Sequence, residues 1–146
     1  MSGRNDSALS RDQRNLVVFR GDSLELTAEV RDLQGDPVDI SGADNIIFSI
    51  AKEAGDEPVV TYEYVAGDID IGSPDSFIVP IKASDTGGLD DVVYWPDYQS
   101  ATLDKIDRKS IEASYYYEAR IIDGDRVSTV LSGRLFVRAS SIEEMS

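Results

Sequence analysis

The stretch that decides the fold is residues 114–138, which read SYYYEARIIDGDRVSTVLSGRLFVR. In its first half every second residue is apolar or aromatic, which is the period of a β-strand with one buried face. These residues are Tyr115, Tyr117, Ala119 and Ile121, and Tyr116 is expected on the outer face. Asp123-Gly124-Asp125 predicts a hairpin turn. On the returning strand the apolar residues of one parity are Val127, Leu131, Leu135 and Val137, with a bulge expected at Gly133.

The same period of two recurs upstream of this hairpin. Leu24, Leu26, Ala28 and Val30 alternate with polar residues, and shorter strand-like runs lie at 16–19, 46–50, 59–65, 69–71 and 77–81. Pro80 cannot donate to a ladder, so its strand is expected at a sheet edge or a bulge. No segment shows the pattern of an amphipathic helix of three turns. The sequence therefore predicts an all-β fold, an immunoglobulin-like antiparallel β-sandwich of seven or eight strands.

Composition narrows the classes of function. The chain carries 28 Asp and Glu against 14 Lys and Arg, a formal net charge of −14. Because this charge repels phosphate backbones and anionic lipid surfaces, we expect neither nucleic acid nor a membrane as a partner. The absence of Cys excludes disulfides and thiolate metal sites, and the absence of His excludes imidazole acid–base catalysis. We expect a protein that is not an enzyme and uses no cofactor.

Three regions are expected along the 146 residues. Residues 1–15 are polar and predict an N-terminal arm, either a tail or a segment that orders on a neighbouring subunit. Residues 16–139 form the predicted sandwich, in which residues 86–109 lack alternation and predict one long inserted loop. Residues 140–146 predict a C-terminal tail. We find neither the apolar run of a signal peptide nor one long enough for a membrane-spanning helix.

The most informative side chains are the aromatic residues of the predicted loop. The one tryptophan, Trp95, lies beside Tyr94 and Tyr98. Aromatic residues are enriched at the hot spots of protein interfaces, so we interpret this cluster as partner-binding. The alternatives are a loop that folds back over the core and a platform on which sugars stack. Arg11 and Arg14 of the polar arm are also predicted to contact a partner.

Acidic turns offer oxygen ligands of the kind that calcium prefers. Two sets are candidates, namely Asp68, Asp70 and Asp75, and Asp32, Asp36 and Asp39. Their spacing matches no fixed calcium loop, so we favour solvated turns and predict no metal site. Arg20-Gly21-Asp22 contains the integrin tripeptide, but its place between two predicted strands indicates a strand break. No catalytic residues are predicted, because no phosphate loop or nucleophile elbow is present.

A series of turn motifs runs through the predicted sandwich. In chain order they are Gly21-Asp22, Asp32, Gly35, Pro37-Val38-Asp39-Ile40, Ser41-Gly42, Asp85-Thr86, Tyr117 and Gly133-Arg134-Leu135-Phe136-Val137. This order resembles the immunoglobulin-like N-terminal domain of tailed-phage baseplate upper proteins and related small virion structural proteins. The resemblance covers residues 15–139.

The resemblance implies a structural virion protein of a tailed bacteriophage, in the tail, baseplate or neck. Such a subunit binds other virion proteins in a symmetric assembly of many copies. The virion is then the expected location, after synthesis in the host cytoplasm. Two alternatives stay open: a protein that decorates the capsid surface, and a carbohydrate- or calcium-dependent binding module that uses the loop aromatics.

Overall fold

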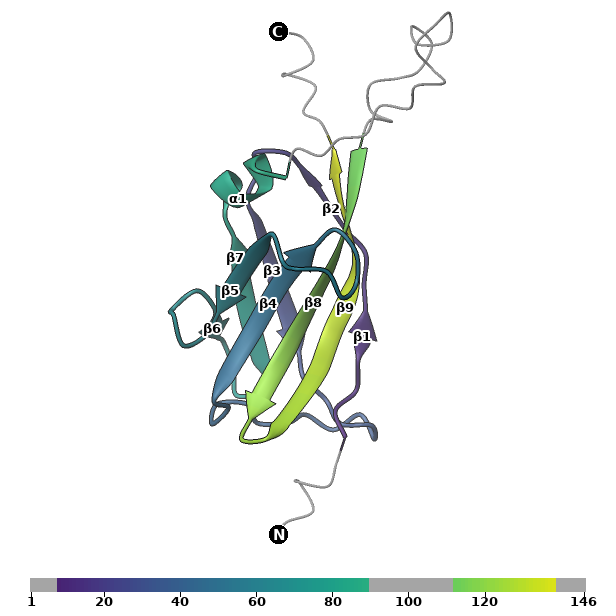
Figure 1. The fold of residues 1–146 in the computed structure, drawn as a ribbon. Helices are drawn as coiled ribbons and strands as arrows, with labels where there is room; N and C mark the ends of the chain where they lie inside the picture. Colours follow the sequence, from purple (N-terminus) through teal and green to yellow (C-terminus); the bar gives the residue numbers. More distant parts are fainter. Residues whose placement is uncertain (1–7, 90–111, 139–146) are drawn as a thin grey trace, which may run out of the picture.

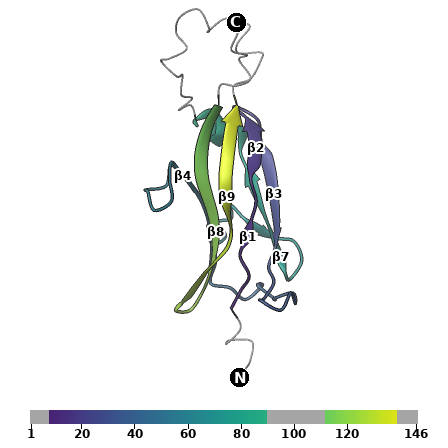
Figure 2. The same cartoon turned by 90° about the vertical axis from the view of Figure 1, so that its right-hand side faces the viewer.

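Two β-sheets packed face to face make up the computed structural model, which describes residues 8–89 and 112–138 (Figures 1 and 2). The larger sheet has the order β1-β9-β8-β4-β5, and β2 also pairs with β9. Its strands are β1 (Asp12–Gln13), β2 (Leu16–Phe19), β4 (Asn45–Ala51), β5 (Val60–Glu63), β8 (Glu112–Asp123) and β9 (Arg126–Arg138). The smaller sheet has the order β3-β7-β6, with β3 (Leu24–Glu29), β6 (Asp70–Ile71) and β7 (Ser76–Ile81). The predicted all-β sandwich is confirmed, while its immunoglobulin-like character stays a prediction.

The core lies between the two sheets, and alternation along the strands fills it as predicted. The inward side chains of β4, β7 and β8 are almost completely buried, whereas their neighbours in the sequence face outward. Phe48 of β4 lies at the centre, with its ring centroid 5.7 Å from that of Tyr117 and 6.1 Å from that of Tyr62. Aromatic pairs at these separations add specific contacts to the apolar burial.

The β8–β9 hairpin carries its bulge at a different place from the predicted one. Ala119 pairs with Leu131 but Arg120 pairs with Thr129, so Val130 is the extra residue. Because of this extra residue, Val130 and Leu131 are both buried. The residues of β9 before the bulge therefore face the opposite side from the one that alternation predicts. Val127, predicted on the buried face, is 55% exposed. The prediction of a bulge at residue 133 was wrong, because that glycine pairs regularly with Tyr117.

Gly133 is needed for a different reason, the close passage of the N-terminal segment. A Cβ atom at this position would lie 1.9 Å from the carbonyl oxygen of Arg14 and 2.8 Å from its carbonyl carbon. The buried hydroxyl of Tyr117 donates a hydrogen bond of 2.6 Å to the same carbonyl oxygen. The missing side chain therefore lets the backbone between β1 and β2 lie directly on the β8–β9 hairpin.

Much of the predicted polar arm is part of the sandwich. Both β1 and β2 run parallel to β9, so the predicted boundary at residue 15 falls inside a continuous edge segment. Backbone hydrogen bonds rather than apolar burial hold the polar part, as in the 3.0 Å bond from the Arg14 amide to the Ser132 carbonyl. Composition alone predicted an arm because the segment is mostly polar, with Leu9 its one leucine. Sheet pairing uses only its backbone.

The turn between β2 and β3 contains the Arg20-Gly21-Asp22 tripeptide and is a strand break, as predicted. Gly21 has a φ of 92°, and its amide donates to the Thr86 hydroxyl at 3.1 Å. This hydroxyl in turn donates to the Asp22 carbonyl at 2.6 Å. Thr86 is completely buried in α1 (Ala83–Gly87), a helix of 5 residues. The short helix thereby anchors the turn at one end of the sandwich.

Pro80 lies in β7, the middle strand of the smaller sheet. It pairs with Glu25 of β3, whereas β6 pairs only with Phe77 and Ile78. The second edge of β7 is therefore without a paired strand at Pro80, which explains how a residue without an amide hydrogen is accommodated. Within residues 8–89 and 112–138, no helix is long and apolar enough to cross a membrane.

Candidate functional site

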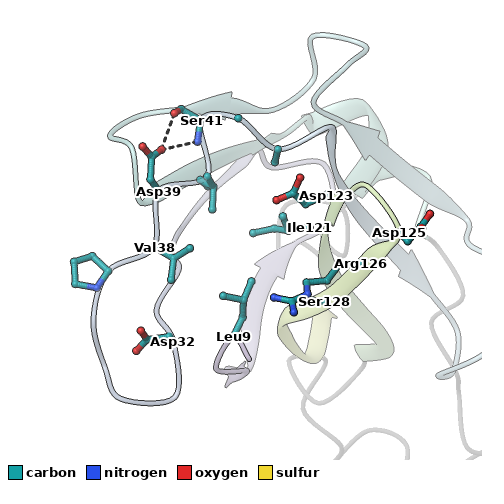
Figure 3. A pocket seen from close by; sticks show the side chains of 14 residues that line it. Leu9, Asp32, Val38, Asp39, Ser41, Ile121, Asp123, Asp125, Arg126 and Ser128 are labelled. Atoms are coloured by element: carbon teal, nitrogen blue, oxygen red, sulfur yellow. Dashed lines mark hydrogen bonds between the residues drawn. The ribbon is translucent and has the colours of Figure 1, made fainter. Parts of the chain in front are cut away.

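The end of the sandwich opposite α1 carries the turn of the β8–β9 hairpin (Figure 1), and a groove opens beside it (Figure 3). It has a volume of about 1140 Å³ and lies between the 37–43 loop and the β8–β9 hairpin. Its apolar floor consists of two nearly inaccessible isoleucines, Ile40 and Ile121, and the half-buried Leu9 and Val38. Ligand grooves of proteins commonly combine such a floor with a few polar groups.

The rim of this groove is strongly acidic. Asp32 and Asp39 belong to the loop side, and Asp123 and Asp125 belong to the hairpin, where Asp125 points away from the 37–43 loop (Figure 3). Arg126 is the one basic residue among the lining side chains that the structure describes. The formal charges around the groove are therefore mainly negative, which favours cationic groups of a ligand.

Backbone hydrogen bonds hold both walls of the groove in place. On one side, the Val38 amide donates to the Val30 carbonyl at 3.0 Å and the Ile40 amide donates to the Pro74 carbonyl at 2.6 Å. On the other side, the Gly124 amide of the hairpin turn donates to the Asp44 carboxylate at 2.6 Å. The groove is consequently built into the fold and does not depend on a ligand for its shape.

Two of the rim carboxylates also organise their own loops. Oδ1 of Asp32 accepts hydrogen bonds from the amides of Gln34 and Asp36, and Oδ1 of Asp39 accepts from the amide and hydroxyl of Ser41. These are side-chain-to-backbone turns of the kind that Asp favours. Both residues therefore have a structural role, whereas Asp123 and Asp125 extend from the hairpin turn.

The two candidate calcium sets do not form metal sites in the described part of the chain. Asp68 accepts a hydrogen bond from the Glu63 amide, and Asp75 accepts one from the Ser73 hydroxyl. Within residues 8–89 and 112–138, no group of three or more acidic side chains is arranged to hold a metal ion. The interpretation of these aspartates as turn residues fits their hydrogen bonds.

Arg11, a predicted partner-binding residue, lies over the outer face of the larger sheet. Its Nε donates to the Ser132 hydroxyl at 3.0 Å, and its Nη2 donates to the Tyr116 hydroxyl at 3.3 Å. Tyr116 lies on the outer face, as predicted, and donates onward to Glu118 at 3.0 Å. Ser132 is only 2% exposed, although it points outward. Arg11 thus makes contacts within its own chain.

Arg14, the second predicted arginine, joins the two sheets at their open side. Its guanidinium donates to the Thr27 carbonyl of β3 at 3.2 Å and lies 3.5 Å from the Asp12 carboxylate. Its backbone is held on β9 and by Tyr117, as described above. The other three predicted partner-binding residues, Tyr94, Trp95 and Tyr98, lie outside the described residues. That the five residues form one partner-binding site therefore stays a prediction.

Two buried tyrosines have shifted ionisation. Burial raises the pKa of Tyr62 to about 12, and the hydrogen bond from its hydroxyl to Asp85 acts in the same direction. The same hydroxyl accepts a hydrogen bond of 2.7 Å from the Lys82 amide. Burial also raises the pKa of Tyr117 to about 12. Both hydroxyls are bonded to backbone or side-chain groups of the fold, so we assign them to its stability.

The groove itself was not predicted from the sequence. Its walls come from segments around residues 9, 32–43 and 121–128, which are separate in the chain. The motif Pro37-Val38-Asp39-Ile40-Ser41-Gly42 was recognised as a turn, but alternation cannot show that it faces the hairpin. The one available signal was the concentration of Asp in the turns at this end.

Comparison with known proteins gives no family for this chain. No protein-family model and no curated protein matches the sequence. One similar solved structure is the E. coli chaperone DraB, with 14% identity, a TM-score of 0.37 and coverage of 93% of this chain. The chain spans only 57% of the length of that chaperone. Another is an uncharacterized protein from Bacillus anthracis str. Ames, with 14% identity, a TM-score of 0.33 and coverage of 90% of this chain and 86% of the other. At these TM-scores neither likeness carries an argument about function.

Proposed function

We propose that this chain is a structural subunit of a tailed-bacteriophage particle and acts through contacts with other virion proteins. The class is proposed from the motif series that resembles small virion domains. The tail, baseplate or neck is the proposed location, and decoration of the capsid surface is the alternative. No chemistry is assigned to the protein in this proposal.

The observation that carries the proposal is that residues of the turn motifs on which the virion resemblance rests are in contact in the structure. Thr86 lies 65 residues after Gly21 and 64 after Asp22 in the sequence, yet its hydroxyl is bonded to both residues. Tyr117 and Gly133 likewise meet at the Arg14 carbonyl. These contacts support the proposal because motif residues that are distant in the sequence lie together in the fold.

The surface supports a role in protein contact. An acidic groove with an apolar floor lies at one end, and its walls are fixed by backbone hydrogen bonds. A preformed surface costs little conformational entropy when a partner binds. In an assembly of many copies, weak contacts of this kind add up through multivalency.

Purified phage particles from the source of this sequence provide the test. We expect mass spectrometry to detect the protein in the particle fraction at many copies per particle, and disruption of its gene to give incomplete particles. Antibody labelling in electron micrographs would distinguish tail from capsid. Absence from purified particles, with abundant protein in the same lysate, would contradict the proposed function.

A further inference from the structure

The acidic groove between the 37–43 loop and the β8–β9 hairpin also indicates what kind of partner it fits. We propose that it docks an extended basic segment of a partner protein, with one apolar side chain on the floor and Lys or Arg side chains against the rim. This inference rests on the proposed function and adds the chemistry of the partner.

The floor sets the first requirement. The half-buried Leu9 and Val38 supply accessible apolar surface, while Ile40 and Ile121 are only 3% and 4% exposed and pack beneath them. An apolar side chain of a ligand that covers such a surface gains about 25 cal/mol for each Å² removed from water. A purely polar ligand would have to desolvate its own polar groups against this surface, so the segment needs at least one apolar anchor.

The rim sets the second requirement. The aspartates come from both walls, Asp32 and Asp39 from one and Asp123 and Asp125 from the other (Figure 3). Cationic side chains on both sides of the anchor therefore find carboxylates. An extended backbone projects successive side chains in opposite directions, which lets an anchor face the floor while its neighbours reach the rim. An acidic segment would be repelled, and this chain as a whole is acidic.

The test is an NMR titration of the full chain with a synthetic peptide that has one leucine flanked on each side by two arginines. We expect shifts confined to residues that line the groove, and weaker binding as salt screens the charges. One control peptide replaces the arginines with glutamine, and another replaces the leucine with serine. We expect each control peptide to bind about tenfold more weakly or not at all.

A matched pair of variants separates local charge from total charge. Asp123→Asn with Asp125→Asn removes the two lining carboxylates of the hairpin, and should weaken binding about tenfold. Asp56→Asn with Glu57→Gln makes the same change of charge at exposed positions of the β4–β5 loop, and should leave binding unchanged. Equal effects of the two variants would overturn the proposal.

Three further results would also overturn it. The first is the absence of groove shifts with the basic peptide. The second is groove signals that move with protein concentration alone, which would mean that a second copy is the occupant. The third is groove signals that move when residues 1–7 are deleted, which would mean that the chain occupies its own groove. If wild-type protein enters particles and the Asp123/Asp125 variant enters equally, the groove proposal fails while the proposed function stands.

Discussion

Replacement of Gly133 by alanine tests how the N-terminal segment is attached. The new Cβ would lie 1.9 Å from the Arg14 carbonyl oxygen, whereas ordinary contacts begin at 3.4 Å. Relief of this clash requires a backbone shift of about 1.5 Å. Such a shift stretches the 2.6 Å hydrogen bond from Tyr117 beyond bonding distance. It also strains the 3.0 Å bond from the Arg14 amide to the Ser132 carbonyl.

The expected loss follows from the groups left without partners. A buried hydroxyl without its acceptor costs about 1–3 kcal/mol, and each lost backbone hydrogen bond costs about 1 kcal/mol. We therefore expect Gly133→Ala to lower the free energy of unfolding by about 2–4 kcal/mol, a large part of the roughly 5–15 kcal/mol of a domain. Urea denaturation followed by fluorescence or circular dichroism measures this change.

Gly42→Ala is the matched control. A Cβ at Gly42 meets nothing within 4 Å, and its φ is not positive, so we expect a change within about 0.5 kcal/mol. A double-mutant cycle with Tyr117→Phe completes the test. Tyr117→Phe should destabilise the wild-type chain but stabilise the Gly133→Ala variant, because there it removes a buried hydroxyl that has already lost its acceptor. A stable Gly133→Ala variant, or purely additive effects, would refute the close passage of the segment over the hairpin.

Three further predictions concern other contacts of the fold. Because burial raises the pKa of Tyr62 and Tyr117 to about 12 from 10.0, the folded state binds these protons more tightly than the unfolded state. Each tyrosine therefore contributes on the order of 2 kcal/mol to the free energy of unfolding below about pH 10, and this contribution is lost between about pH 10 and pH 12. In urea denaturation at several pH values, Phe variants should show a shallower fall of the free energy of unfolding with rising pH. Thr86→Val should lower the free energy of unfolding by about 2–3 kcal/mol in urea denaturation, because it leaves the Gly21 amide and the Asp22 carbonyl without their partner. Thr86→Ser, which keeps the hydroxyl, should lower it less, and equal losses would contradict this role. Arg11→Gln should change the free energy of unfolding by less than about 1 kcal/mol, since the partners of Arg11 lie on the outer face of the sheet. It should nevertheless increase hydrogen exchange at neighbouring amides of β1. Unchanged exchange would count against a role of the bonds from Arg11 to Ser132 and Tyr116 in holding β1.

The bulge in β9 shows where sequence periodicity stops being informative. Alternation located the strand and predicted the buried Leu131, Leu135 and Val137. It could not locate the extra residue, because Val130 and Gly133 are both plausible bulge positions in a pattern of apolar residues. Gly133 is a glycine for a different reason, because the Arg14 backbone, distant in the sequence, lies against it.

The candidate groove shows the same limit for the site. Turn chemistry at Asp32, Asp39 and Gly124 was readable from the sequence and agrees with the hydrogen bonds of these turns. That the loop and the hairpin face each other over Ile40 and Ile121 depends on strand order and register, which local patterns do not encode. The polar N-terminal segment was misjudged for a related reason, since its attachment uses backbone groups that are the same in every residue type.

By itself, the sequence determined that this protein is an acidic all-β chain whose strands bury every second side chain. A period of two and turn residues act over short distances, so they are visible in the amino-acid order. Only the tertiary structure decided that β1 and β2 lie on β9, that Gly133 must lack a side chain, and that an acidic groove forms opposite α1. These features come from contacts between residues distant in the chain, where packing and excluded volume select among arrangements that the local pattern permits equally.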